Sequence, residues 1–163
     1  APTRVWTSPM VRTRETAEVI AGRLGLTPDV VEDLREGDFG DWQGLTHREI
    51  REGWPGELDR WHYVEGVQPP GGESFAQVAG RVRDVAGRAL AEHAGESVVL
   101  VCHNIVTKSG IGTLAGMDPQ AWYDTRIPPG SISILRLWPE SHELVVLGLP
   151  GEVGETRATD TLF

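Results

Sequence analysis

The sequence predicts an α/β fold, in which helices pack against a mostly parallel sheet. The main observation is an unbroken apolar run rich in β-branched residues, Val98–Cys102, which is typical of a strand buried on both faces of such a sheet. Apolar residues at helical spacing precede it from Phe75 to His93, and Gly95 ends that pattern. A helix leading directly into a buried strand is the repeating unit of α/β proteins. The length of 163 residues suits one domain, residues 1–163, with its own core.

The first part of the chain predicts a strand, a long helix and an irregular loop. Arg4–Thr7 is short, extended and partly apolar, as expected for a strand. We expect the helix to follow with Ser8 as its N-cap and Gly25 as its stop. A second short strand is expected at Val30–Val31, before a loop with three glycines that spans residues 34–44.

The middle of the chain contains two capping boxes. In this motif the side chains of the N-cap residue and of the residue three positions later each bond the other's backbone N–H. Thr46 and Glu49 form the first, and Ser74 and Gln77 form the second, at the start of the long helix that precedes the buried strand. Between them, residues 54–68 carry a weaker helical pattern.

The last part of the chain predicts a helix after the buried strand and then a hairpin. Asn104 is the expected N-cap of that helix, and a shorter helix is expected to begin at Pro119. Two extended, partly alternating segments then predict an antiparallel hairpin at a sheet edge, Ser131–Trp138 and Glu143–Leu149. The polar tail, residues 150–163, is expected to be loosely held.

The composition excludes several classes of function. With 24 acidic and 15 basic residues the net charge is −9, whereas a nucleic-acid-binding surface is usually basic, so we expect no nucleic-acid partner. No apolar run reaches membrane-spanning length, so we expect no membrane partner. Cys102 is the only cysteine, which excludes a disulfide framework and fits a cytoplasmic location. Acidic residues and histidines are not clustered at ligand spacing, and we expect neither a metal nor a cofactor.

Three polar residues occupy positions where an α/β fold commonly places its active site. His103 stands between the carboxyl end of the buried strand and a helix N-terminus, a natural place for an anion. Arg12 lies in the first turn of the first helix and leans toward the end of the preceding strand, and Glu36 opens the glycine-containing loop. Taken singly, the competing interpretations are a structural histidine, a solvated arginine and a solvated carboxylate.

Four segments together resemble the histidine phosphatase (phosphoglycerate mutase-like) superfamily. Residues 7–17, Thr-Ser-Pro-Met-Val-Arg-Thr-Arg-Glu-Thr-Ala, are similar to its Ser-Pro-Leu-x-Arg-Ala-x-x-Thr-Ala segment. Residues 34–44 resemble its Leu-Arg-Glu…Gly-x-Trp-x-Gly segment, and residues 70–74 match its Pro-Gly-Gly-Glu-Ser turn. Residues 101–103 resemble its Val-Ser-His strand end. The segments follow one another in the family's order, and the resemblance covers nearly the whole chain.

The resemblance implies a three-layer fold, with a mostly parallel sheet flanked by helices, and hydrolysis of a phosphomonoester through a phosphohistidine. It assigns phosphate binding to Arg12, His103 and Asn104, and catalysis to Glu36 and His103, with Glu36 donating a proton to the leaving oxygen. These residue types suit the roles, because an arginine fork binds phosphate and a carboxylic acid can protonate an alkoxide. The expected partner is a small phosphorylated substrate.

The family's nucleophile is the histidine of an Arg-His-Gly motif on its first, central strand, and none of the five histidines here follows an arginine. We therefore expect that strand to lie upstream of Ala1, which would make this domain N-terminally incomplete. The alternative is a catalytically inactive relative that keeps the phosphate pocket as a binding or interaction module. Mutase activity is less favoured because the segment between Trp42 and Gly72 is short, and a metal hydrolase has little support.

The substrate is the least determined part of the interpretation. Trp42 and Arg126 are candidates for lining a substrate pocket, although large aromatic residues lie more often in the core. Asn104 replaces the glycine that the family usually has after this histidine, and we expect its side chain to narrow the pocket. The C-terminal hairpin also offers a strand edge through which a homo-oligomer can form.

Overall fold

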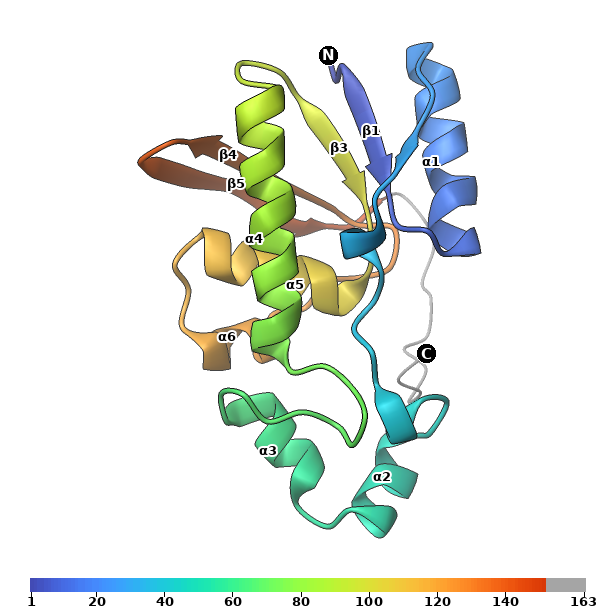
Figure 1. Ribbon diagram of the computed structural model, residues 1–163, viewed down its shortest axis with the longest axis vertical. Coiled ribbons are helices and arrows are strands. Elements are labelled where there is room, and N and C mark those ends of the chain that lie inside the picture. The colour runs from blue at the N-terminus through green and yellow to red at the C-terminus, as the bar shows by residue number, and fades with distance from the viewer. Residues whose placement is uncertain (152–163) are drawn as a thin grey trace.

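The computed structural model describes residues 1–151 and forms an α/β fold with a parallel sheet (Figure 1). β1 (Arg4–Thr7) is the middle of three strands, with β2 (Asp29–Val30) on one side and β3 (Val98–Val101) on the other. Both neighbours run parallel to it, and Thr7 pairs with the last residue of each. The carboxyl ends of all three strands therefore meet at one edge, which is where ligands bind in open α/β sheets.

Helices cover both faces of this sheet, as the three-layer prediction requires. Side chains alternate along a strand. Val5 and two neighbours in β3, Val99 and Val101, pack with α1 (Val11–Leu24). Trp6 and Val98 point to the opposite face and join the main core with α4 (Phe75–Glu92).

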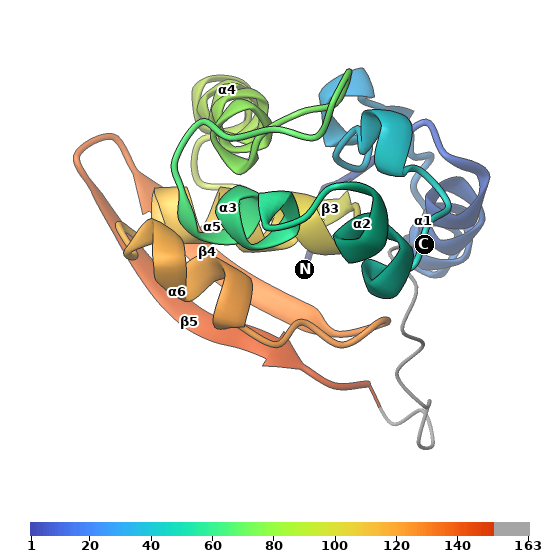
Figure 2. The same ribbon diagram turned by 90° about the horizontal axis from the view of Figure 1, so that it is seen from below.

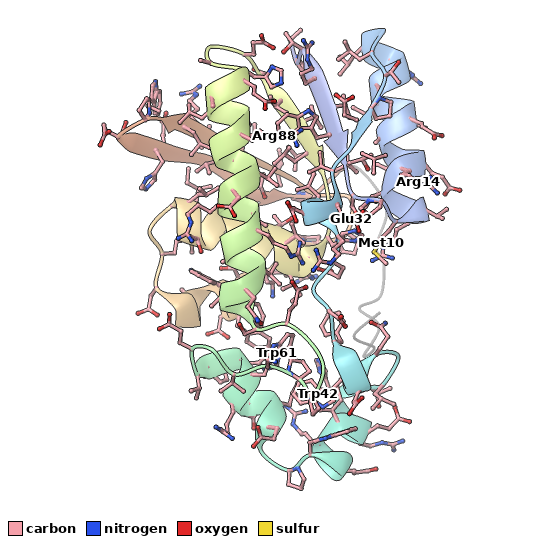
Figure 3. All side chains as sticks on the ribbon, in the orientation of Figure 1. Met10, Arg14, Glu32, Trp42, Trp61 and Arg88 are labelled. Carbon is pink, nitrogen blue, oxygen red and sulfur yellow. The ribbon has the colours of Figure 1, made fainter. Side chains whose placement is uncertain are left out.

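Between β2 and α4 the chain holds two short 3-10 turns, Glu32–Leu34 and Gly40–Trp42, and two short helices, α2 (His47–Gly53) and α3 (Glu57–Tyr63). The two helices lie at the lower end of the molecule in Figure 1. Trp42 and Trp61 lie together here, edge to face, with ring centroids 5.9 Å apart (Figure 3). The prediction that Trp42 lines a substrate pocket is wrong for this structure, because its side chain is completely buried in the core.

The remaining elements are α5 (Asn104–Leu114), α6 (Pro119–Asp124) and a hairpin of β4 (Ile132–Trp138) and β5 (Ser141–Leu149). Seen from below, α5 lies between α4 and the hairpin (Figure 2). The packing of α5 on α4 depends on Gly110, because a Cβ there would stand 2.4 Å from a methyl carbon of Val82.

The hairpin is antiparallel, as predicted, but forms a two-stranded sheet of its own among the described residues. The predicted burial of β3 is also wrong. Its residues are only partly buried, and Leu100 is 37% exposed. The physical reason is that β3 is paired along one edge only, with β1, within residues 1–151.

Local signals located most helix ends correctly. Both predicted capping boxes are present, and Gly25 ends α1 with a left-handed φ of 68°. Two N-caps differ from the prediction. Met10 rather than Ser8 precedes α1, and His103 rather than Asn104 precedes α5. The predicted loose tail, residues 150–163, falls almost entirely outside the described residues.

Candidate active site

The structure brings Arg12, Glu36 and His103 together at the carboxyl end of the sheet. Arg12 lies in the first turn of α1, immediately after β1, and His103 follows β3 as the N-cap residue of α5. Glu36 lies in the loop after the first 3-10 turn. Its carboxyl group faces the backbone N–H groups of Ile105 and Val106 in the first turn of α5, so it lies at the same end of the sheet. Three segments that are distant in sequence thus converge on one helix N-terminus, where partial positive charge favours an anion.

The hydrogen bonds of His103 define its protonation. Its Nδ1 lies 2.9 Å from Arg12 Nη2, and a guanidinium nitrogen can only donate, so Nδ1 accepts. Its Nε2 lies 2.8 Å from Ser8 Oγ and therefore carries the proton that it donates to this hydroxyl. The imidazole is neutral in this arrangement. Ser8 is fully buried, and its Oγ also accepts from the backbone N–H of Met10 at 3.3 Å.

The surroundings of His103 keep it uncharged over the physiological range. Burial is the main cause and the positive charges of Arg12 and Arg81 add to it, lowering the pKa of the imidazole to about 4. The residue is 7% exposed, whereas Arg12 lies open to solvent. The site therefore presents an exposed guanidinium that donates to a buried, neutral imidazole.

Glu36 has the electrostatic character of a proton donor. Burial raises the pKa of its carboxyl group above the ordinary value. Backbone N–H groups and the charge of Arg12 oppose this shift, and the N–H of Gly37 donates to the carboxylate at 3.0 Å. A carboxylic acid with a raised pKa stays protonated nearer neutral pH, which is what general acid catalysis requires.

Arg81 was not predicted as a site residue, yet its guanidinium binds the backbone of the loop that carries Glu36. Its guanidinium donates to the backbone carbonyl of Glu36 at 3.1 Å and forms an ion pair with Glu73. A signal for this pair was present, because Glu73 belongs to the recognised Pro-Gly-Gly-Glu-Ser turn and Arg81 follows it by eight residues, within the helix that the turn introduces.

Two other predicted site residues stand apart from these contacts. The Asn104 side chain is half-buried, and its Oδ1 has no hydrogen-bond partner among the described residues. Arg126 lies exposed in the loop between α6 and β4.

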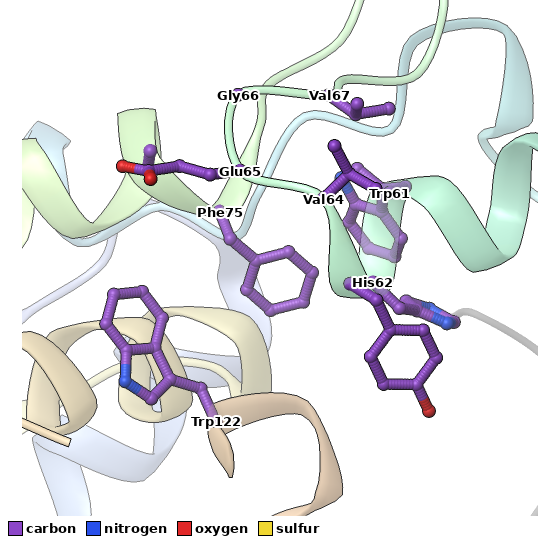
Figure 4. A pocket seen from close by; sticks show the side chains of 10 residues that line it. Trp61, His62, Val64, Glu65, Gly66, Val67, Phe75 and Trp122 are labelled. Carbon is purple, nitrogen blue, oxygen red and sulfur yellow. The ribbon is translucent and has the colours of Figure 1, made fainter. Parts of the chain in front are cut away.

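A hollow is lined by aromatic residues from α3, α4 and α6 (Figure 4). Trp61, Phe75 and Trp122 form its apolar walls, and His62 lies at its side. His62 stacks on Tyr123 with ring centroids 3.5 Å apart. Burial, with the nearby charges of His47, Arg51 and Lys108, lowers the pKa of His62 to about 3. None of Arg12, Glu36 and His103 lines this hollow.

Residues 1–151 contain neither a candidate metal site nor a membrane-spanning helix. The described residues contain no group of three or more histidine, cysteine, aspartate or glutamate side chains arranged to hold a metal ion. None of their helices is long and apolar enough to cross a membrane.

Comparison with known proteins gives consistent matches. Residues 1–150 match the family model described as histidine phosphatase superfamily (branch 1). A bifunctional protein of Mycobacterium tuberculosis is 34% identical over 143 residues, which cover 88% of this chain and 39% of that protein. The chain thus spans about two fifths of the length of this curated relative.

A relative of similar size and a solved structure agree with that match. A 2,3-bisphosphoglycerate-dependent phosphoglycerate mutase of Beijerinckia indica is 30% identical over 154 residues, covering 88% of this chain and 74% of the mutase. The solved structure of a mycobacterial glucosyl-3-phosphoglycerate phosphatase superposes with a TM-score of 0.82 at 29% identity, covering 92% of this chain and 79% of that one.

Proposed function

The chain belongs to the histidine phosphatase superfamily, and on this basis we propose that its protein hydrolyses a small phosphomonoester through a phosphohistidine intermediate. The observation that carries the proposal is the convergence of Arg12, His103 and Glu36 at the N-terminus of α5. This combination offers two donors for phosphate oxygens and one acid for a leaving group, which is what phosphoryl transfer needs.

In the proposed reaction Arg12 binds the phosphoryl group of the substrate. One of its N–H groups now donates to His103 Nδ1 at 2.9 Å. A phosphate oxygen is a stronger acceptor because it is charged, so substrate binding exchanges this internal contact for a charge-assisted one. The released imidazole can then take up a proton at Nδ1 and donate to a second phosphate oxygen.

Glu36 acts as the general acid. As a nitrogen of the proposed nucleophilic histidine forms its bond to phosphorus, the P–O bond breaks, its electron pair goes to the leaving oxygen, and the Glu36 carboxyl group supplies the proton that this oxygen needs. Water then attacks phosphorus, the N–P bond breaks, and the proton of the water returns to the Glu36 carboxylate. The raised pKa of Glu36 keeps that proton available. Asn104 is a further candidate for phosphate binding, a role in which its side-chain Nδ2 would donate, because the unpartnered Oδ1 can only accept.

The proposal includes a histidine nucleophile on a strand that precedes residue 1. Two features support it. The edges of β3 and β4 that are unpaired within residues 1–151 offer backbone groups for such a strand. Large apolar side chains on these strands are also open to solvent, including Leu100 at 37%, Ile132 at 56% and Ile134 at 43% exposure. An additional strand between β3 and β4 would cover apolar surface of this kind.

The test uses the natural polypeptide, with the residues that precede this chain, and 4-nitrophenyl phosphate as substrate. We expect release of phosphate by the wild type, trapping of a phosphorylated histidine at short reaction times, and a loss of roughly 10²–10³-fold in turnover for His103→Ala. A wild type without turnover would contradict the proposal, as would an unchanged rate for His103→Ala. Transfer of the phosphoryl group to a phosphoglycerate instead of to water would indicate a mutase.

A phosphate-binding module without catalysis is the second candidate. The absence of Arg-His-Gly from the 163 residues favours it. In that case inorganic phosphate would bind to the natural polypeptide and binding would depend on Arg12, but no phosphohistidine would form.

A further inference from the structure

We propose that Arg81 and Glu73 are positioning residues that determine where the Glu36 carboxyl group stands, and thereby control proton donation to the leaving oxygen. The inference rests on the proposed phosphatase function and adds two residues to its site. Neither residue is hydrogen-bonded to Arg12 or His103. Arg81 acts on His103 only through its positive charge, which a lysine at this position keeps, whereas its hydrogen bonds go to Glu73 and to the loop that carries Glu36.

Arg81 uses all five of its N–H groups to hold the Glu36 loop and Glu73. Its Nη1 donates to the carbonyls of Asp33 and Arg35 at 2.6 and 2.7 Å. Its Nη2 donates to the carbonyl of Glu36 and to a Glu73 carboxylate oxygen, both at 3.1 Å. The remaining donor, Nε, reaches the other Glu73 oxygen at 3.1 Å. A guanidinium has five donors in a fixed plane, so no other side chain can reproduce this set.

Glu73 holds the same loop on the far side of Glu36. Its carboxylate accepts from the backbone N–H of Asp38 and from Arg35 Nη2, both at 3.0 Å. The backbone N–H of Glu73 also donates to the carbonyl of Asp38 at 2.7 Å. The loop is therefore fixed on both sides of Glu36, from Asp33 to Asp38.

The burial of Arg81 and Glu73 strengthens these hydrogen bonds. The side chains of Arg81 and Glu73 are 9% and 15% exposed, so water competes for their hydrogen bonds much less than at the surface. A buried ion pair often stabilises a fold no more than packed apolar groups of similar volume would. Stability alone therefore does not account for the partners of Arg81. The carbonyls that Arg81 holds belong to the segment that carries the acid.

The proposed role has a consequence that a purely structural role lacks. A leaving group of low pKa departs as an anion and needs little help from an acid, whereas an alkoxide needs the proton of Glu36 during P–O cleavage. Displacement of the carboxyl group by about 1 Å can cost on the order of 10²-fold in rate. Weakening the contacts of Arg81 and Glu73 should thus slow the hydrolysis of alkyl phosphates more than that of aryl phosphates.

The experiment measures kcat/KM of the natural polypeptide for 4-nitrophenyl phosphate and for glycerol phosphate. The variants are Arg81→Lys, which keeps the charge but has three donors at one point, and Glu73→Gln, which keeps the shape but loses the charge. We expect each to lower kcat/KM for glycerol phosphate by roughly 10–100-fold and that for 4-nitrophenyl phosphate by less than about threefold.

Arg88→Lys is the matched control. Arg88 lies on the same helix with its guanidinium 4.1 Å from the centre of the Trp6 ring (Figure 3), and its expected effect on both substrates is nil. Equal losses on the two substrates would overturn the proposal, as would no loss on either. Failure of both variants to fold, seen by circular dichroism, would also overturn it by showing a structural role. A wild type without turnover would instead refute the proposed function.

Discussion

The candidate site has two halves that are built in different ways: an acid half around Glu36, and a phosphate half of Arg12 and His103. Around Glu36, backbone and side-chain contacts are saturated: Arg81 uses every donor, and Glu73 accepts from three groups of the surrounding chain. Around the phosphate position, Arg12 is exposed and donates to His103. In the proposed reaction the acid is thus fixed before substrate arrives, whereas Arg12 and His103 hold each other in a contact that an anion can replace. Preorganisation is useful at the acid, because small displacements there are costly.

The largest expected effect comes from removing the exposed cation of the phosphate half. Arg12→Met should lower kcat/KM of the natural polypeptide for 4-nitrophenyl phosphate by about 10²–10³-fold, because the main charge-assisted contact to the phosphoryl group is lost. Arg14→Met, on the same helix and exposed, is the matched control and should leave kcat/KM unchanged (Figure 3). A similar loss in both variants would contradict the assignment.

The acid half is tested by pH. Because Glu36 must be protonated to act, kcat/KM for an alkyl phosphate should fall as pH rises through its pKa, which burial raises above 4.5. Glu36→Gln should lower this rate by about 10²-fold and abolish the falling limb of the profile. If the limb persists in Glu36→Gln, another group supplies the proton and the acid half has been assigned wrongly.

A smaller effect on kcat/KM is expected from the buried Ser8, which contacts His103. Ser8→Ala removes the acceptor of the His103 Nε2 proton, 2.8 Å away, and leaves that buried donor without its partner. One neutral hydrogen bond is worth about 1 kcal/mol, so we expect a fall in kcat/KM of roughly fivefold, while donation from Arg12 to Nδ1 keeps the proton on Nε2. Ring-nitrogen NMR of His103 should show a shifted Nε2 signal with an unchanged tautomer, and an unaltered Nε2 signal in Ser8→Ala would contradict the hydrogen-bond assignment.

The smallest effect concerns stability. His103 and His62 have folded-state pKa values of about 4 and about 3, against 6.5 in the unfolded chain. As pH falls below 6.5 the unfolded chain binds protons that the folded protein does not, so stability is present above pH 6.5 and is lost toward pH 4. We expect the midpoint of thermal unfolding to fall by several degrees between pH 7 and pH 5, and by less in His62→Phe. A midpoint independent of pH in this window would show that neither imidazole is held neutral.

Much of the fold could be predicted from local sequence. The predictions that failed for Ser8 and Trp42 concern side chains whose surroundings are set by residues distant in the sequence. The capping boxes at Thr46 and Ser74 and the left-handed Gly25 depend on neighbouring residues, and all three are observed. Ser8 was expected to cap α1, but its hydroxyl meets His103, which is 95 residues away. Trp42 was expected near substrate, but its indole is enclosed by α2, α3 and their neighbours.

The site was also predicted only in part, because some of its residues belong to recognisable local segments and others depend on contacts distant in the sequence. Arg12, Glu36 and His103 could be selected because family resemblance placed each on a recognisable segment, and the structure brings them together. Arg81 was missed because three of its five contacts go to backbone carbonyls 45 to 48 residues earlier in the chain, which leave no trace in side-chain patterns. Only its pairing with Glu73, eight residues earlier, is visible in the sequence.

The most direct test of the account follows the ring nitrogens of His103 by NMR while inorganic phosphate is added to the natural polypeptide at pH 6. Without phosphate, we predict a neutral imidazole protonated at Nε2, in keeping with its contacts to Arg12 and Ser8. Saturation with phosphate should release Nδ1 from Arg12 and raise the pKa of His103 from about 4 toward or above its ordinary value, so that the ring gains a proton. Phosphate that binds while both nitrogens and the pKa of His103 stay unchanged would contradict the phosphate site proposed here.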